Sequence, residues 1–190
     1  MLNLNFTPFP YFETEELIFR ETVETDKNIL FQLRSNPEVM HYIGRPVAKN
    51  FEDVLPVYKM MIDNVANNIS VPWWIVLKAT NETVGQIGFH YIDIQNERAE
   101  IGYYLLPQYQ NKGITTKAIK AVVAYGFEHL HFHSIEAKVD PENTASARVL
   151  QKNGFIEEGM LRQNYYYNNR FNNTQIFGIL KDEWYAKNKS

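Results

Sequence analysis

Hydrophobic and polar positions divide the chain into short strands and amphipathic helices. Continuous or alternating apolar runs predict strands over residues 17–23, 73–79, 84–93, 99–106, 134–139, 155–167 and 171–181. Apolar residues at helical spacing predict helices over residues 25–35, 37–42, 50–65, 113–129 and 144–153. Early antiparallel strands followed by alternating strands and helices indicate an α+β fold, with a mixed, mostly antiparallel sheet flanked by helices. We expect a single domain that spans residues 1–190.

Turn-forming residues support these boundaries. Asn81-Glu82 and Asn96-Glu97 separate three consecutive strands and predict tight connections between them. Asn168-Asn169-Arg170 separates the last two strands in the same way. Gly154 follows the 144–153 helix, at the position where a left-handed glycine commonly ends a helix.

The bulk composition narrows the classes of function. The chain has 190 residues, 45% of them hydrophobic and 14% aromatic, which is enough for the core of one ordinary domain. A formal charge of −3 leaves no global basic field, so nucleic acid is not expected as a direct partner. The chain has no cysteine, which excludes disulfides, thiolate metal ligands and a cysteine acyl-enzyme.

The chain shows no targeting or membrane pattern. Its first ten residues lack a basic start and a sustained apolar stretch, and Pro8 and Pro10 interrupt them. The longest strongly apolar run, residues 71–77, is far shorter than the roughly 18 residues that a membrane span needs. We therefore expect a cytoplasmic protein with no membrane partner.

A polar turn between an apolar strand and an amphipathic helix carries the strongest functional signal. It reads Gln110-Asn111-Lys112-Gly113-Ile114-Thr115 and combines small and polar residues with one glycine. Main-chain N–H groups at the start of the helix can therefore face outward. These groups and the positive end of the helix dipole favour an anion such as a diphosphate, and Lys112 and Lys117 add positive charge. The segment lacks the G-x-x-x-x-G-K-[ST] spacing of a P-loop.

In this setting, Gln-x-x-Gly-x-Thr resembles the Q/R-x-x-G-x-G/A acyl-CoA loop of the GNAT N-acetyltransferase superfamily. Further segments follow the order of its Rim-type branch: Thr14-Glu-Glu-Leu-Ile-Phe-Arg20 with Asp26, Asn36-Pro-Glu-Val-Met-His-Tyr42, Val84-Gly-Gln-Ile-Gly88, Ala99-Glu-Ile-Gly-Tyr103, Asn143-Thr-Ala-Ser146 and Asn153-Gly-Phe155. The match covers roughly residues 14–184. It implies the GNAT acyl-CoA N-acyltransferase fold, with acetyl-CoA as acyl donor and an amine as acceptor. In this branch the acceptor is often the α-amino group of a protein.

The resemblance also implies which residues bind the donor. The loop from Gln110 to Thr115 would hold the diphosphate, and it departs from the family at Thr115, where Gly or Ala is usual. The strand 99–106 would part from the strand 134–139, so that main-chain groups of Leu105 and Leu106 bond the pantetheine arm and polarise the thioester carbonyl.

Two further residues are implied near the thioester. Asn143 and Ser146 begin the helix after strand 134–139, where the family directs side chains towards the pantetheine and the thiol. We expect Asn143 to bind the cofactor or a water, and Ser146 to protonate the thiolate. The alternatives are a helix cap for Asn143 and an ordinary first-turn residue for Ser146. Tyrosines are alternative acids, namely Tyr103, Tyr104 or the run Tyr165-Tyr166-Tyr167.

Glu100 is the candidate general base. It alternates with Gly102 and Tyr104 on one strand face, which the family picture directs towards the incoming amine. A carboxylate could remove the ammonium proton directly or through a water. The alternative is a strand glutamate that pairs with Arg98 or Arg20, and Asp93 is a second acidic candidate.

Two conspicuous groups of residues have simpler explanations. His129, His131 and His133 alternate in a connection between a helix and a strand, and we expect a solvated loop, with no metal bound by the chain. Trp73 and Trp74 point to opposite faces of a strand, so we expect one in the core and the other on the sheet surface. The alternative is that one of them borders the acceptor pocket.

The leading hypothesis is an N-acetyltransferase in which a neutral amine attacks acetyl-CoA directly within a ternary complex. One alternative is a non-catalytic acyl-CoA-binding regulatory domain. Another is the same chemistry on a small amine such as a polyamine or an aminoglycoside antibiotic. The aromatic terminal hairpin is a candidate surface for a homodimer.

Overall fold

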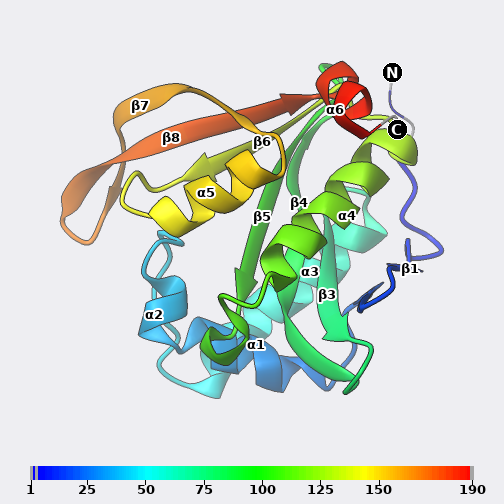
Figure 1. The fold of residues 1–190 in the computed structure, drawn as a ribbon. Coiled ribbons are helices and arrows are strands. Elements are labelled where there is room, and N and C mark those ends of the chain that lie inside the picture. Colours follow the sequence, from blue (N-terminus) through cyan, green and yellow to red (C-terminus); the bar gives the residue numbers. More distant parts are fainter. Residues whose placement is uncertain (1, 3, 189–190) are drawn as a thin grey trace.

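The computed structural model describes residues 2 and 4–188, so Met1, Asn3, Lys189 and Ser190 of the expected domain lie outside the described residues (Figure 1). Among the described residues an eight-stranded sheet has the order β1-β2-β3-β4-β5-β6-β8-β7. Its strands are β1 (Phe12–Glu13), β2 (Leu17–Arg20), β3 (Val71–Leu77), β4 (Glu82–Asp93), β5 (Arg98–Leu105), β6 (Ser134–Val139), β7 (Ile156–Tyr167) and β8 (Arg170–Leu180). The helices are α1 (Asp26–Arg34), α2 (Pro37–Met40), α3 (Leu55–Ala66), α4 (Ile114–Glu128), α5 (Thr144–Lys152) and α6 (Lys181–Asn188), with 3₁₀ turns at Phe51–Val54 and Pro107–Tyr109.

The sheet is mixed, which confirms the expected α+β class. All pairs of neighbouring strands run antiparallel except β5 and β6, which run parallel to each other. In Figure 1, α4 crosses the front of β3, β4 and β5, while α3 lies behind them. Within the described residues, no helix is both long and apolar enough to cross a lipid bilayer.

Two clusters of buried side chains lie on opposite faces of the sheet. On one face α4 packs Ile119 and Val122 against the strands. On the other face Leu30 of α1 and Met61 of α3 pack on Trp74. The expectation that one of Trp73 and Trp74 lies on the sheet surface is therefore wrong, because helices cover both faces and both side chains are fully buried.

Polar caps begin several of the helices. Asn36 accepts hydrogen bonds from the main-chain N–H groups of Glu38 and Val39, at 2.9 and 3.2 Å, at the start of α2. Asn50 and Asp53 form a reciprocal capping box before α3. Gly154 has a φ of +91°, which confirms it as the left-handed residue that follows α5.

Several boundaries differ from the sequence prediction. β3 is Val71–Leu77 rather than 73–79, α2 ends at Met40 rather than at residue 42, and β1 was not predicted. β2 ends at Arg20 rather than Val23, because the Asp26 carboxylate accepts the N–H of Val23 and two guanidinium N–H groups of Arg20. β8 ends at Leu180, and the helix α6 that follows was not predicted. α6 has only a weak helical pattern, but Trp184 is buried against the core and fixes it there.

Candidate active site

The two parallel strands at the centre of the sheet part from each other. β5 pairs with β6 only where Arg98–Glu100 lies beside Ser134–Glu136. Beyond Glu100, β5 stays paired with β4, and β6 stays paired with β8. A gap therefore opens between the second half of β5 and the end of β6, as the resemblance implied (Figure 1).

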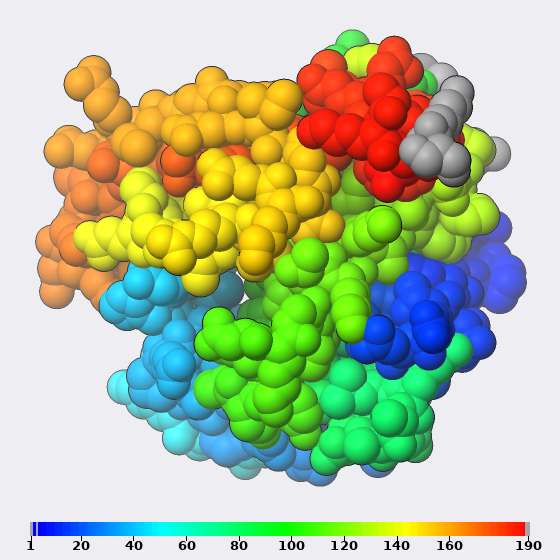
Figure 2. Space-filling model, viewed as in Figure 1, coloured from blue at the N-terminus to red at the C-terminus, as the bar shows by residue number. Residues whose placement is uncertain are grey.

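Two cavities meet at this gap. The smaller, about 290 Å³, lies between the loop after β5, α2 and the start of α5. Figure 2 shows the corresponding hollow between the yellow atoms of α5, the green atoms at the start of α4 and the blue atoms of α2. The larger, about 470 Å³, lies over β4, β5 and β6 on the face covered by α1 and α3. Both cavities are lined by Tyr42, Ile43, Tyr103, Tyr104, Asn143 and Ser146, so one passage crosses the sheet.

Main-chain groups of β5 face the gap. The N–H of Leu106 donates to the carbonyl of Val84 at 2.9 Å, and its carbonyl accepts from Tyr109 at 3.0 Å. Because main-chain groups alternate in direction along an antiparallel strand, those of Tyr103 and Leu105 point the other way, into the gap. The structure therefore argues against Leu106 as a main-chain ligand of the donor. It favours Leu105, whose carbonyl accepts from Gln110 Nε2 at 3.3 Å, together with Tyr103.

The loop that precedes α4 has the backbone of an anion site. Asn111 and Gly113 have φ angles of +58° and +77°, and this left-handed turn directs the first N–H groups of α4 outward. The side chain of Ile114 is buried in the core, so only its main chain can reach a ligand. Gln110, Asn111 and Thr115 line the smaller cavity.

The two lysines near this loop differ in their partners. Lys117 Nζ lies 2.6 Å from the Glu16 carboxylate, so its charge is already paired within the chain. Lys112 Nζ lies 5.5 Å from the centre of the Tyr109 ring. We therefore assign the positive charge near the proposed anion site to Lys112. The expectation that Lys117 adds to it is wrong, because Glu16 already balances the charge of Lys117.

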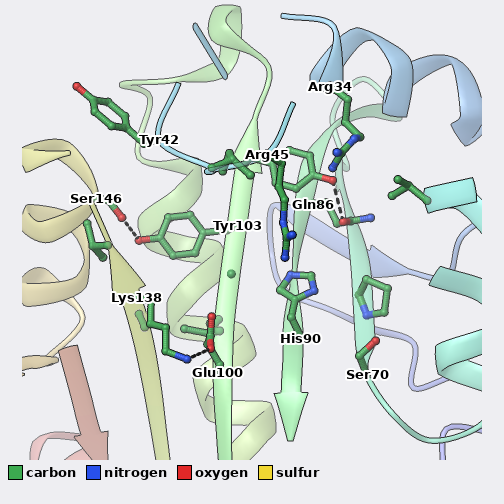
Figure 3. Close-up of a pocket in the computed structure, with 18 of the residues that line it drawn as sticks. Arg34, Tyr42, Arg45, Ser70, Gln86, His90, Glu100, Tyr103, Lys138 and Ser146 are labelled. Atoms are coloured by element: carbon green, nitrogen blue, oxygen red, sulfur yellow. Dashed lines mark hydrogen bonds and ion pairs between the residues drawn. The ribbon is translucent and has the colours of Figure 1, made fainter. Parts of the chain in front are cut away.

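A tyrosine and a serine form a hydrogen-bonded pair where the cavities meet. Tyr103 Oη and Ser146 Oγ are 2.7 Å apart (Figure 3). Burial raises the pKa of the Tyr103 hydroxyl to about 12, against the opposite effect of the Ser146 hydrogen bond. The pair therefore keeps its protons at neutral pH and can donate one. The run Tyr165-Tyr166-Tyr167 lies in β7 and lines neither cavity.

Asn143 has the capping role that the sequence left as an alternative. Its side-chain oxygen accepts the N–H of Ser146 at 3.0 Å at the start of α5. This bond orients the turn that carries Ser146 and leaves the amide nitrogen of Asn143 as its group for a ligand. Asn143 lines both cavities, so a cofactor contact stays a prediction.

Glu100 is held in an ion pair. Its Oε2 lies 2.6 Å from Lys138 Nζ, as Figure 3 shows, and both residues line the larger cavity. The partner is therefore neither Arg98, which pairs with Glu136, nor Arg20, which pairs with Asp26. The second acidic candidate, Asp93, accepts hydrogen bonds from Asn96 and lies outside both cavities.

His90 is a candidate base that the sequence analysis missed. It is the extra residue of a β-bulge between Phe89 and Tyr91, and its ring lines the larger cavity (Figure 3). The side chain is exposed to solvent through the open side of the cavity, while many protein atoms lie around the ring. The loss of hydration lowers the pKa of His90 below its usual 6.5, although Glu100 and the Gly102 backbone act in the opposite direction. The imidazole is therefore neutral at pH 7 and able to accept a proton.

Gly102 makes the position of His90 possible. A Cβ atom at Gly102 would lie 2.7 Å from His90 Cδ2, which is closer than real Cβ atoms approach. The glycine in Glu100-Ile-Gly102 is the one sequence signal that could have indicated a large side chain opposite it. The alternation along β4 gave no such signal, because the bulge interrupts it.

The alternating histidines do not converge. His129, His131 and His133 are all exposed in the connection from α4 to β6. Within residues 2 and 4–188, no group of three or more His, Asp or Glu side chains is arranged to hold a metal ion.

Comparison with known proteins identifies relatives along nearly the whole chain. The family model of the acetyltransferase (GNAT) domain matches residues 16–156. The uncharacterized N-acetyltransferase YoaA of Bacillus subtilis is 35% identical over 173 residues, which cover 91% of this chain and 98% of the relative. A GNAT-family acetyltransferase from Bacillus anthracis has a TM-score of 0.80 at 29% identity, covering 90% and 99% of the two chains.

Two more distant structures share the fold and differ in acceptor. Spermidine N-acetyltransferase from Vibrio cholerae, in complex with CoA and spermine, has a TM-score of 0.80 at 22% identity, covering 90% and 99% of the chains. RimL, a ribosomal L7/L12 α-N-protein acetyltransferase in complex with coenzyme A, has a TM-score of 0.80 at 22% identity, covering 90% and 97%.

Proposed function

Because this chain belongs to the GNAT family of acetyl-CoA-dependent N-acetyltransferases, we propose that it acetylates a primary amine by direct attack within a ternary complex. The observation that carries this proposal is the passage through the parted strands. The groups proposed to bind the donor lie on one side of it, His90 and Glu100 lie on the other, and the Tyr103 and Ser146 hydroxyls lie between.

The smaller cavity is the proposed donor side. The loop from Gln110 to Thr115 would hold the diphosphate on the first N–H groups of α4, with Lys112 adding positive charge. The main-chain groups of Tyr103 and Leu105 would bond the pantetheine arm, and an N–H among them would stabilise the oxygen of the thioester carbonyl as negative charge develops on it.

The larger cavity is the proposed acceptor side. A neutral amine attacks the thioester carbon, a C–N bond forms and the C–S bond breaks. Neutral His90 takes the proton that the amine nitrogen loses, directly or through a water. The CoA thiolate takes a proton from the hydrogen-bonded pair of Tyr103 and Ser146, so that free CoA leaves as the thiol.

The sequence analysis predicted Glu100 as the general base, and this proposal gives it a different role. Its carboxylate is paired with Lys138, and its negative charge raises the pKa of His90, against the lowering that loss of hydration causes. We therefore propose Glu100 as a positioning and electrostatic residue beside His90, with direct proton removal by Glu100 as the competing role.

We propose that the acceptor is a protein α-amino group, as in the Rim-type branch, in preference to a polyamine. The order of segments along the chain supports the α-amino group, and the RimL likeness is compatible with it. The Vibrio cholerae spermidine enzyme shows that the same fold also serves polyamines. The positive charges of Arg34 and Arg45 in the larger cavity disfavour a polycation.

The test is the release of free CoA from acetyl-CoA, followed with a thiol reagent, on a panel of N-terminal peptides and polyamines. We expect His90→Gln to lower kcat/KM about a hundredfold or more, and Glu100→Gln to lower it less. If Glu100→Gln lowers kcat/KM more than His90→Gln does, Glu100 and not His90 is the base. Retained acetyl-CoA binding with no turnover on any amine would contradict the proposed reaction.

The homodimer stays a prediction. The surface it would use is the hairpin of β7 and β8, where large apolar side chains are exposed, namely Ile156, Met160, Leu161, Tyr166 and Phe171.

A further inference from the structure

Two arginines line the proposed acceptor side and not the donor side. Arg34 is the last residue of α1, and Arg45 lies in the loop after α2. Both line the larger cavity, and neither lines the smaller one that reaches the loop at Gln110 to Thr115. Their positive charges are therefore placed for the acceptor and not for the phosphates of CoA.

Neither guanidinium has a carboxylate partner in the described part of the chain, where no Asp or Glu oxygen lies within 4.0 Å of either. This contrasts with the third cation of the cavity, Lys138, which is paired with Glu100 at 2.6 Å and also approaches Glu136 at 3.5 Å. The remaining carboxylate of the cavity, Asp140, follows β6 on the other side of the gap. The wall formed by α1 and the loop after α2 thus has an excess of positive charge.

The two side chains approach the catalytic groups. In Figure 3 the Arg45 side chain extends towards the His90 ring, and the Arg34 guanidinium lies near Gln86. Tyr104 donates to Gln86 Oε1 at 3.1 Å, so Arg34 borders a fixed pair of polar groups. Arg34 is half-buried and Arg45 is exposed at the edge of the cavity. The lack of a counterion is therefore costly mainly for Arg34, and a bound anion would offset that cost.

We infer that the acceptor is a primary amine whose molecule also carries an anionic group, a carboxylate or a phosphate, which Arg34 and Arg45 bind. This inference rests on the proposed function, because it gives the larger cavity to the acceptor. Planar guanidinium groups suit both anions, since each can donate two parallel hydrogen bonds to them. The same charges repel a polycation, so the site selects against polyamines.

The first experiment compares acceptors of matched size and different charge in the CoA-release assay. The acidic amines are γ-aminobutyrate and phosphoethanolamine, which separate carboxylate from phosphate. Their counterparts are γ-aminobutyramide and ethanolamine, which are neutral apart from the amine, and putrescine, which adds a second cation. A peptide pair, Ala-Glu-Ala amide and Ala-Gln-Ala amide, tests the same charge on a longer acceptor. We expect kcat/KM for at least one acidic amine to exceed that for its neutral counterpart by about tenfold or more.

The second experiment removes the arginines. In Arg34→Gln and Arg45→Gln we expect the KM of the acidic amine to rise about tenfold or more, with an unchanged KM for acetyl-CoA. Arg162→Gln is the matched control, because Arg162 is exposed on β7, outside both cavities. It removes the same charge and should change neither KM.

A binding measurement separates this inference from the proposed reaction. Calorimetry would follow γ-aminobutyrate and phosphoethanolamine binding to the protein saturated with CoA. Binding that both arginine variants weaken, without turnover, would support the anion site while contradicting the reaction. Equal or better turnover of the neutral amines or putrescine would overturn the inference and leave the reaction standing. The absence of both binding and turnover would overturn both.

Discussion

His90 depends on a glycine on the neighbouring strand. The bulge in β4 places its ring over Gly102, where any larger residue would collide with it. Such an arrangement couples the proposed base, His90, to a glycine that leaves space for its ring. A substitution at either position should therefore affect catalysis, but in distinguishable ways.

The proposed role of His90 as the base predicts how the rate depends on pH. Loss of hydration lowers the pKa of His90 below 6.5, and the groups that face it in the cavity include Glu100 and Arg45. Above that pKa the imidazole is neutral and can accept the amine proton, and below it the imidazolium cannot. We expect kcat at saturating acceptor, where titration of the free amine does not contribute, to fall as the pH drops, with an apparent pKa below 6.5. This acid limb should disappear in His90→Gln.

Gly102→Ala serves as the comparison. The added methyl displaces the His90 ring but leaves a titrating imidazole, so we expect a lower rate with the acid limb still present. Profiles of kcat at saturating acceptor between about pH 5 and about pH 8 would report both effects. An acid limb that persists unchanged in His90→Gln would refute the assignment of His90 as base.

At this scale the sequence predicts some site residues and misses others for a physical reason. The loop from Gln110 to Thr115 could be predicted because its signal is local, a glycine and polar residues between a strand and a helix. His90 could not be predicted, because a bulge shifts the register that alternation relies on. Arg34 and Arg45 come from an early helix and loop, and only the tertiary fold brings them to β4 and β5.

At the scale of elements, one ion pair joins β2 to α1. Asp26 is buried and accepts two hydrogen bonds from Arg20, at 2.7 and 2.8 Å, and one from the N–H of Val23 at 2.8 Å. Arg20 also donates to Thr83 on β4, so the pair fixes the end of β2 and the start of α1 against the sheet.

Removal of this carboxylate should destabilise the fold. We expect Asp26→Asn to lower the free energy of unfolding by about 3 kcal/mol, because it leaves the Arg20 guanidinium without its charge partner in a largely buried setting. Urea denaturation followed by circular dichroism measures the change. Asp63→Asn is the matched control, since it removes a carboxylate from the exposed pair with Lys59 and should barely move the midpoint. Equal midpoints for the two variants would contradict this account.

The elements themselves were predicted well where their pattern was strong. The hairpin turn at Asn168-Asn169 has φ angles of +51° and +58°, as residues of this type favour in a tight hairpin. α6 was missed because its polar residues, Lys181, Asp182 and Glu183, give little helical pattern. The contact of Trp184 with the core holds α6 in place, and no local rule could have predicted that contact.

At the scale of the whole molecule, the last hairpin touches the loop that carries Arg45. The Tyr167 hydroxyl on β7 donates to the main-chain carbonyl of Arg45 at 2.8 Å, across 122 positions of sequence. The Tyr165 ring also lies beside Gly44, since a Cβ there would be 3.4 Å from it. The C-terminal strands thus support one wall of the larger cavity.

Loss of this support should weaken acceptor binding alone. We expect Tyr167→Phe to raise the KM for the acceptor about two- to tenfold, as for one lost hydrogen bond, and to leave the KM for acetyl-CoA unchanged. Tyr166→Phe is the control, because Tyr166 is exposed, packs on Phe171 and has no bond to the loop. Initial-rate measurements with each substrate varied would show the difference, and a matching rise in both variants would rule out this role for Tyr167.

The passage through the parted strands also affects how substrates enter the enzyme and products leave it. Its two mouths open on opposite faces of the sheet, one beside the start of α4 and the other beneath α1 and α3. If the cavities hold donor and acceptor as proposed, neither substrate has to cross the path of the other, and we expect initial-rate kinetics without an obligatory order of binding. CoA would then leave through its own opening while the acetylated product still occupies the opposite one.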